Sequence, residues 1–318
     1  MSREVRGGWT LRPYTPADAS AFAALQSLGG RATTAGDLLS GDARRPPADL
    51  LRRRLLVTQD GTVLGGSQVR TFAFVPPDHL QAAVLVHPAA RAQGAGEILW
   101  ADLHQAARDA GALGLSADVP DTDPSALSWA QRRGFQVHAH RFASELNLTA
   151  FDPAPFQESL AGARVQGVTF TDLRGADQTV VDRYLHFVAD RLIETPDLAG
   201  QPRWSADQVR AMLRLTHDPR PDWLILAVGP DGTWLGTTAL VRFPSLPFVY
   251  NELTAMHPAA RGRGLALPLK LQIVERARAE GYAAMRTNNH ARNAPMLAVN
   301  RRLGFKHLNG RFEVRRPL

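Results

Sequence analysis

Residues 250–281 read YNELTAMHPAARGRGLALPLKLQIVERARAEG, which is a strand, a glycine-rich turn and a helix in succession. The first seven residues alternate between two faces, as in a half-buried strand. Leu267, Leu271 and Val274 then recur at the spacing of one helix face. The RGRG stretch at 261–264 joins strand to helix, where free backbone N–H groups at the helix start favour an anion. This unit predicts a mixed α/β domain with a phosphate-type turn.

The unit occurs twice in the chain. HPAARGRGLA at 257–266 repeats HPAARAQGAG at 87–96, and RLGF at 302–305 repeats RRGF at 132–135, both at an offset of 170 residues. A period of this length is a whole domain rather than a solenoid repeat. The 318 residues therefore predict two domains related by tandem duplication.

The expected boundaries follow from the repeat. We expect the first domain at 1–150, a linker at 151–167 and the second domain at 168–318. The linker segment has two prolines, several small residues and no sustained periodicity. The second copy is longer, and its extra residues lie near 191–218, where we expect the acceptor pocket.

Each copy is expected to be rich in strands first and then to alternate strand, helix, strand, helix and strand. In the second copy, a turn at 230–232 joins two strands. The remaining expected elements are strands at 81–86, 113–119, 250–256 and 282–289, and helices near 98–106, 123–135, 265–281 and 293–305.

The composition excludes several kinds of protein. The chain has no cysteine, so disulfides, thiolate metal sites and a cysteine nucleophile are excluded. The first residues, MSREVRGGWTLRPY, do not resemble a signal peptide, and no window approaches about 18 continuous apolar residues. We therefore expect a soluble cytoplasmic protein that has no membrane partner.

The net charge of +7 comes almost entirely from arginine, since Lys270 and Lys306 are the only lysines among 37 basic residues. Arginine suits phosphate and carboxylate groups. The arginines are spread along the chain, and no aromatic-rich basic platform or DNA-reading helix is evident. We therefore expect no nucleic-acid partner.

Two common phosphate motifs do not match the turn. A P-loop needs Lys and then Ser or Thr after its last glycine, and a dinucleotide fingerprint needs glycine at 267, where Leu267 stands. The observed pattern is R-x-x-G-x-G/A after a strand ending in V/M-H-P, followed some 30 residues later by the stretch N-A-P-M-L-A-V-N-R-R-L-G-F at 293–305. This pattern resembles the GNAT superfamily of acyl-CoA-dependent N-acyltransferases, of a tandem-domain type. The resemblance covers both copies and is strongest from Tyr250 to Phe305.

The resemblance implies an α/β fold with a mixed sheet in each domain and two parallel strands that splay apart to admit the acyl group. It also implies acetyl-CoA as co-substrate, with its pyrophosphate on the glycine-rich turn. Carried over to the second copy, the implied CoA-binding residues are Met256, His257, Arg261, Gly262, Arg263, Gly264, Leu265, Ala266 and Asn293. The first copy keeps Arg91, Gly94 and Gly96, but has Asp123 in place of Asn293.

Glu252 is the candidate catalytic base. Strict alternation along the strand places its side chain on the same face as Met256, four residues on. The alternative interpretation is a surface acid paired with one of the many arginines. The first copy has Ala82 at the matching position, and Ala92 replaces the first glycine of its turn, so we expect the first domain to be degenerate and the second to be catalytic.

The position at which many members of the superfamily carry a tyrosine acid holds Asn300 here. Protonation of the leaving thiolate is then dispensable or falls to Tyr250 or His290. Asn288 and Asn289 either orient substrate or form a turn. His138 and His140 lack acids or cysteines at metal-ligand spacing, so no metal is expected.

Together with these residues, the resemblance implies an N-acetyltransferase that transfers an acetyl group from acetyl-CoA to a primary amine of a small molecule, by direct attack in a ternary complex. The alternative is a non-catalytic CoA-binding or regulatory protein with two domains of this type. Within the extra region, Glu194, Asp197 and Trp204 are the residues that we expect at the acceptor pocket. Neither the acceptor nor the oligomeric state follows from the sequence.

Overall fold

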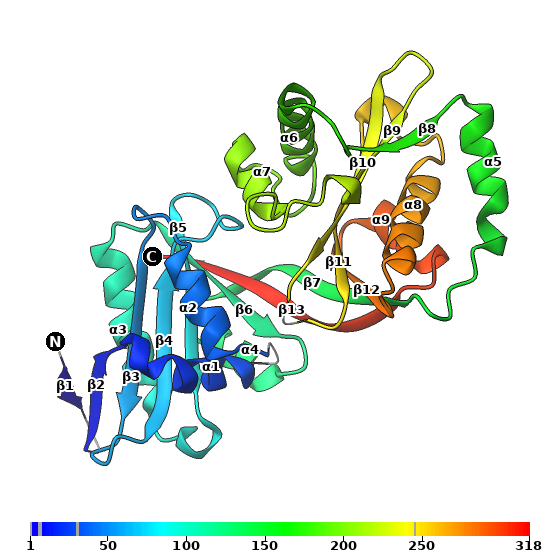
Figure 1. Cartoon of the computed structure of the whole chain (residues 1–318). Coiled ribbons are helices and arrows are strands. Elements are labelled where there is room, and N and C mark those ends of the chain that lie inside the picture. The colour runs from blue at the N-terminus through cyan, green and yellow to red at the C-terminus, as the bar shows by residue number, and fades with distance from the viewer. Residues whose placement is uncertain (1, 6–7, 30–31, 245) are drawn as a thin grey trace. The chain divides into compact units, whose positions relative to one another are not determined.

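The computed structural model describes residues 2–5, 8–29, 32–244 and 246–318 (Figure 1). It divides into two compact units. Unit 1 consists of Met1–His140 together with Gly310–Leu318, and unit 2 consists of Arg141–Asn309. Each unit is a mixed sheet with helices on both faces, as expected for two α/β domains in tandem.

The sheet of unit 1 is antiparallel except where β5 and β6 run parallel. Its helices lie on both faces, because Gly65 and Gly66 are successive residues of β4 and meet α3 and α1 respectively. The strand order is β1 (Arg3–Val5), β2 (Trp9–Pro13), β3 (Leu51–Val57), β4 (Val63–Arg70), β5 (His79–Val86), β6 (Gly114–Pro120) and the end of β13 (Lys306–Pro317). The helices are α1 (Ala19–Ser27), α2 (Ala35–Ala43), α3 (Ala95–Asp109) and α4 (Pro124–Gln131), with short 3-10 turns at η1 (Pro16–Asp18) and η2 (Pro88–Ala90).

Unit 2 repeats this plan. The strand order is the second half of β7 (Gln136–Asn147), then β12 (Ala284–His290), β11 (Val249–Met256), β10 (Trp234–Arg242), β9 (Leu224–Val228) and β8 (Thr169–Asp172). The helices α6 (Gln178–Leu192) and α7 (Ala206–Met212) lie on one side of β9–β11 in Figure 1, and α5 (Gln157–Val165), α8 (Ala266–Ala279) and α9 (Ala294–Arg302) lie on the other. The 3-10 turns are η3 (Ala154–Phe156), η4 (Pro221–Trp223) and η5 (Pro258–Ala260). The strands and helices expected around the two glycine-rich turns are confirmed, with shifts of a few residues at their ends.

The final strand of each repeat completes the sheet of the other unit. In unit 2, Arg141–Asn147 of β7 pairs antiparallel with β12, from Arg141 opposite His290 to Asn147 opposite Ala284. In unit 1, Arg311–Pro317 of β13 pairs with β6. The units therefore begin and end elsewhere than at 150 and 168, because strand pairing rather than chain order decides which sheet a residue joins.

The segment 151–167, expected as a linker, is folded and belongs to unit 2. Phe151 and Phe156 stack with ring centroids 5.6 Å apart, and Leu160 of α5 is buried in the same apolar core. Its prolines favour η3 and the start of α5, since proline fits the first turn of a helix. Apolar packing therefore orders a segment whose composition is that of a linker.

Candidate functional site

The glycine-rich turn of unit 2 connects β11 to α8 through η5. Gly262 and Gly264 have φ of 75° and 73°, in the left-handed region that favours glycine. A Cβ at either position would meet no atom within 4 Å, so backbone conformation is what requires glycine there. Leu265 is buried and precedes Ala266, the first residue of α8. The turn thus presents backbone N–H groups at the positive end of a 14-residue helix, which suits a phosphate group.

The side chains of the turn have partners within unit 2. Arg261 forms an ion pair with Glu194, which also accepts a hydrogen bond from Arg191 at 2.7 Å. The Arg263 Nε donates to Gln166 Oε1 at 3.2 Å. Glu194 therefore holds Arg261, one of the two arginines predicted to bind the pyrophosphate.

His257 and Asn293 act as helix caps. The Nδ1 of His257 accepts from the N–H of Ala259 at 3.3 Å, and the His257 ring stacks on Phe187 with centroids 6.5 Å apart. Asn293 Oδ1 accepts from the N–H of Met296 at 3.4 Å, at the start of α9. Contact of either residue with CoA stays a prediction.

The turn of unit 1 follows the same backbone path. Gly94 has φ of 91°, and Ala92, which stands where unit 2 has Gly262, has φ of 59°. An alanine in this region costs about 1 kcal/mol relative to glycine. Arg91 Nε donates to the Val86 carbonyl at 3.4 Å, and Gly96 lies in α3, where a Cβ would touch Trp129. The loss of one glycine therefore leaves the turn's shape intact.

The parallel strands β11 and β12 pair at only two positions, Val249 opposite Met285 and Tyr250 opposite Arg286. Beyond these positions, side chains bridge the two strands. Thr287 Oγ1 donates to the Asn251 carbonyl at 3.0 Å, and the Tyr250 hydroxyl donates to Asn288 Oδ1 at 3.2 Å. The strands thus stop pairing just before Glu252, as the splayed strands of the resemblance imply.

Glu252 lies at a β-bulge. Leu253 faces Ala239 of β10 and Asn251 faces Leu240, so Glu252 is an extra residue without a counterpart in the ladder. The strict alternation expected along β11 is therefore wrong here: the Thr254 hydroxyl donates to Asn251 Oδ1 at 3.1 Å, which places two side chains of opposite expected faces together. A bulge often redirects one side chain at a functional site.

The carboxyl group of Glu252 has no hydrogen-bond partner among the described residues. Glu252 is partly buried, and this burial raises its pKa to about 7, while the nearby positive charge of Arg214 opposes the rise. Among the described residues no arginine forms an ion pair with this carboxyl group, and whether Glu252 is catalytic stays a prediction. A carboxyl group that titrates near neutral pH can exchange a proton with a substrate at physiological pH.

Lys270 and Asn300 form a buried polar chain that sequence reasoning missed. Lys270, 1% exposed, donates from Nζ to Asn300 Oδ1 at 2.6 Å, and Asn300 Nδ2 donates to Asn289 Oδ1 at 2.7 Å. Asn289 in turn donates to Ser144 Oγ at 2.9 Å. Burial lowers the pKa of Lys270 to about 7. The signal in the sequence was a lysine on the apolar face of a helix, in a chain that otherwise uses arginine.

The other candidates have structural partners. His290 is buried, and its Nδ1 accepts from the N–H of Arg292 at 3.1 Å. His140 Nε2 lies 2.9 Å from Asp121 Oδ2. Within the described residues, no group of three or more His, Cys, Asp or Glu could hold a metal ion. Nor does any helix in this part of the chain have the length and apolar character to span a membrane.

The three residues expected at the acceptor pocket have partners within unit 2, and their place at that pocket stays a prediction. Glu194 pairs with the turn, Asp197 Oδ1 accepts from Arg141 at 2.6 Å, and Trp204 is buried in the core. The same extra region instead supplies Arg214, beyond α7, whose charge reaches Glu252. The sequence marks Arg214 in one way: it stands just after a helix, at a position where glycine is usual.

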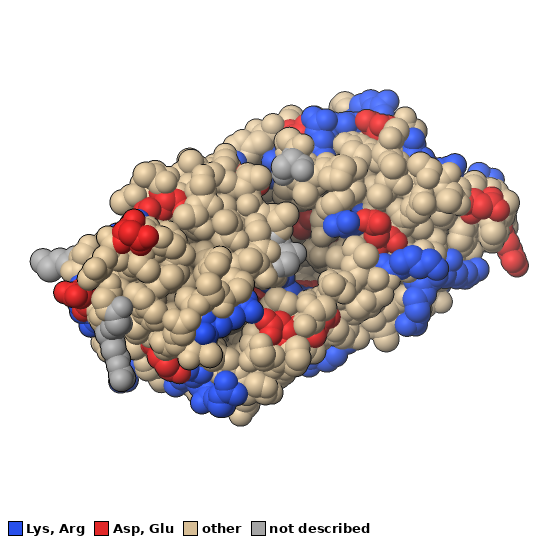
Figure 2. Space-filling model, turned by 90° about the horizontal axis from the view of Figure 1, so that it is seen from below, with Lys and Arg blue, Asp and Glu red and all other residues tan. Residues whose placement is uncertain are grey.

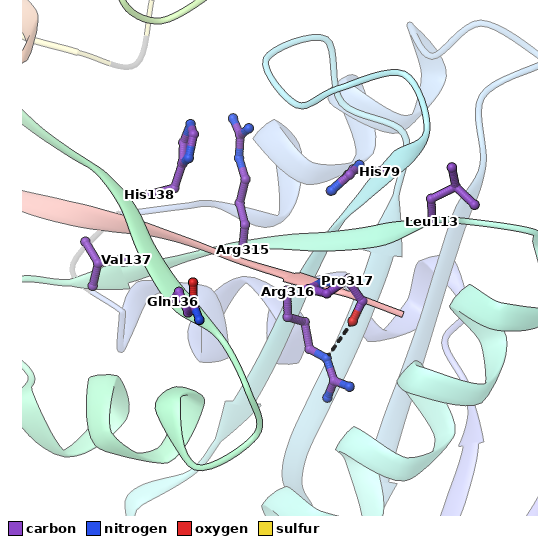
Figure 3. A pocket seen from close by; sticks show the side chains of 8 residues that line it. All are labelled: His79, Leu113, Gln136, Val137, His138, Arg315, Arg316 and Pro317. Carbon is purple, nitrogen blue, oxygen red and sulfur yellow. Dashed lines mark hydrogen bonds between the residues drawn. The ribbon is translucent and has the colours of Figure 1, made fainter.

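Figure 3 shows a pocket in unit 1 that contains none of the predicted site residues. Two histidines and two arginines lie on its wall, and their side chains do not converge on one point. It is lined by His79, Leu113, Gln136, Val137, His138, Arg315, Arg316 and Pro317.

The surface charge is mixed. On the face seen in Figure 2, basic and acidic side chains are interspersed in small groups rather than gathered into one basic surface. Most of the arginines that form ion pairs do so with acids of their own unit, for example Arg286 with Glu145 at 2.6 Å. The expected absence of a nucleic-acid partner stays a prediction.

Comparisons with known proteins agree with this geometry. The model of the acetyltransferase (GNAT) family matches residues 31–135 and 189–305, one segment in each copy. A GCN5-related N-acetyltransferase from Sphaerobacter thermophilus has a similar structure, with a TM-score of 0.77 and 19% identity over 98% of this chain and 96% of that one. A tandem GNAT protein from the clavulanic acid biosynthesis pathway has a TM-score of 0.71 and 21% identity over 97% and 98%. None of the curated proteins compared with the chain matches it.

Proposed function

The chain belongs to the acetyltransferase (GNAT) family, and from this premise we propose that it transfers an acetyl group from acetyl-CoA to a primary amine of a small molecule. The observation that carries the proposal is Glu252: a carboxyl group at a bulge, without a hydrogen-bond partner, on the strand that leads into the glycine-rich turn. We propose that unit 2 is the catalytic domain, since Ala82 occupies this position in unit 1.

The residues of the turn suit the co-substrate. Left-handed glycines at 262 and 264, the start of α8 and two arginines together provide groups that favour an anion. We assign the pyrophosphate to Arg261–Ala266 and the pantetheine arm to Met256, His257 and Asn293, as the resemblance implies. Acetyl-CoA supplies the activated thioester.

Glu252 acts as the general base in this proposal. Its carboxylate takes the proton from the attacking amine, directly or through one water, as the nitrogen bonds to the carbonyl carbon and the carbon–sulfur bond breaks. The thiolate is a tolerable leaving group because a thiol has a pKa of about 8.5. With no cysteine in the chain, transfer proceeds without an acyl-enzyme on a protein thiol.

A cytoplasmic location of the protein remains a prediction.

The test is release of free thiol from acetyl-CoA over a panel of primary amines, with mass spectrometry of the acetylated product. Thiol release that depends on the amine supports the enzyme. Binding of CoA without thiol release from any amine would instead support the non-catalytic alternative. Unit 1 keeps the shape of the turn but has Ala82 in place of the acid, which favours CoA binding without catalysis for the first domain. Native mass spectrometry should therefore count the CoA molecules bound per chain.

Removal of the acid that holds Arg261 is expected to tighten CoA binding. Glu194 pairs with Arg261 in unit 2, and the pyrophosphate must compete with this carboxylate. We expect Glu194→Gln to lower the Kd for CoA by about 1.5- to 5-fold, the range of a partly exposed ion pair. Isothermal titration calorimetry at two salt concentrations measures it. Weaker binding in the variant would mean that Glu194 orients Arg261 for the ligand instead of competing with it.

A further inference from the structure

Arg214 occupies a position where an arginine is unfavourable. It follows α7 with φ of 57° and is one of two non-glycine residues with positive φ among those described. The N–H of Leu215 donates to the Arg210 carbonyl at 3.1 Å, which is the helix ending that usually has glycine at the left-handed residue. The backbone therefore bears strain to present this long side chain.

Among the described residues Arg214 forms no ion pair, although its positive charge acts on the Glu252 carboxyl group. Its Nε is buried and has no hydrogen-bond partner, and its Cζ lies 4.8 Å from the centroid of the Phe243 ring. Neighbouring arginines are paired: Arg210 with Asp182 at 3.2 Å, and Arg242 with Asp218 through a hydrogen bond of 2.9 Å. Arg214 thus keeps donors available for an anion from outside the chain.

A group of aromatic side chains in contact with one another extends from Arg214 toward the proposed base. Phe243 meets Tyr250 edge to face with centroids 6.1 Å apart, and Phe248 lies 5.7 Å from Tyr250. Tyr250 precedes Glu252 by two residues on β11. The charge of Arg214 also reaches the Glu252 carboxyl. The guanidinium of Arg214, these three aromatic rings and the Glu252 carboxyl group therefore border one region of unit 2.

We propose that the acceptor is an amine that carries an anionic group, a carboxylate or a phosphate, which Arg214 binds while the amine lies at Glu252. The inference rests on the proposed function and adds the class of acceptor to it. An arginine fork binds either anion through paired N–H donors, and the Phe243 ring keeps the guanidinium plane in place. In unit 1 the helix at the corresponding place in the element order is α2, but Ala82 replaces Glu252, so unit 1 lacks this combination of a cation and a base.

The experiment compares matched acceptors. Each proteinogenic amino acid is paired with its decarboxylated amine, for example tyrosine with tyramine, and O-phosphoethanolamine is paired with ethanolamine. We expect kcat/KM to favour the anionic member of the accepted pair by about 10- to 100-fold, the range for a charged hydrogen bond in a desolvated site. A preference for the amino acid over its decarboxylated amine identifies the anion as a carboxylate. A preference for O-phosphoethanolamine over ethanolamine identifies it as a phosphate.

The decisive variant is Arg214→Gly, since glycine suits φ of 57° and the fold should be retained or stabilised. In this variant we expect the ratio of kcat/KM for the anionic acceptor to kcat/KM for the neutral acceptor to fall by about 10- to 100-fold. Arg210→Gln, which removes a paired arginine from the helix that Arg214 follows, should leave the preference unchanged. The Arg214→Gly variant should also shift the acidic limb of the pH profile to higher pH.

The outcomes separate the two proposals. Equal use of anionic and neutral amines, or a preference that survives Arg214→Gly, overturns the anion site while the acetyltransferase stands. Acetylation of no amine at all overturns the proposed function and the inference together.

Discussion

Glu252→Gln is expected to lower kcat/KM for acetyl transfer by about 100- to 10,000-fold, the usual contribution of a positioned general base. Gln keeps the size of the side chain but accepts no proton. Because the pKa of Glu252 is raised to about 7, the wild-type rate should increase with pH through the neutral range, as the carboxylate form appears. This limb should vanish in the variant, whereas the limb set by the acceptor's own ammonium should be common to both proteins.

Steady-state kinetics from pH 5.5 to 9.5 checks this prediction. Glu275→Gln is the matched control, since Glu275 is an exposed carboxylate on α8, and its profile should superimpose on that of the wild type. A Glu252→Gln variant that retains the full rate at every pH would show that another group, or solvent, takes the amine proton.

The second large effect concerns stability. Lys270→Met is expected to raise the free energy of unfolding at pH 6, since it removes a charge that is buried without an anionic partner among the described residues. Burial lowers the pKa of Lys270 from 10.5 to about 7, and this shift corresponds to a gain of roughly 3 to 5 kcal/mol in the free energy of unfolding when the charge is removed. Loss of the hydrogen bond to Asn300 offsets about 1 to 3 kcal/mol of this gain.

The direction with pH follows from proton binding. Between pH 7 and 10.5 the unfolded chain holds a proton on Lys270 that the folded chain has released, so wild-type stability should rise with pH over this range. The advantage of Lys270→Met should therefore be largest at pH 6 and small at pH 9.5. Denaturant unfolding at the two pH values measures the difference.

Lys306→Met provides the control, because Lys306 is the only other lysine and is exposed. Unit 1 already contains the apolar version of this site: at the offset of 170 residues, Trp100, Ala130 and Val119 replace Lys270, Asn300 and Asn289. The fold therefore does not require the polar chain. If Lys270→Met is equally destabilised at both pH values, the packing of the lysine stem rather than its charge decides the result.

The duplication, the α/β class, the glycine-rich turn and most of the elements around it could be predicted from the sequence. These features are local: alternation with period two, apolar spacing of a helix and glycine at left-handed residues are all contained within some 30 neighbouring residues. A repeat also shows itself as identity between two stretches, without knowledge of any contact. The choice of Glu252 rested on such local spacing, and its role remains to be tested.

Tertiary structure decided what depends on distant segments. Strand pairing placed Arg141–Asn147 in unit 2 and Gly310–Leu318 in unit 1, and the register of β10 against β11 created the bulge at Glu252. The sequence could show neither, because pairing between strands far apart in the chain leaves no periodic signal, and an extra residue in one strand of a ladder interrupts the alternation without marking itself in the composition. Packing of Asn300 of α9 and of the Phe305 ring against Lys270 likewise buried a cation that a helix alone would leave in water, and this burial lowers its pKa.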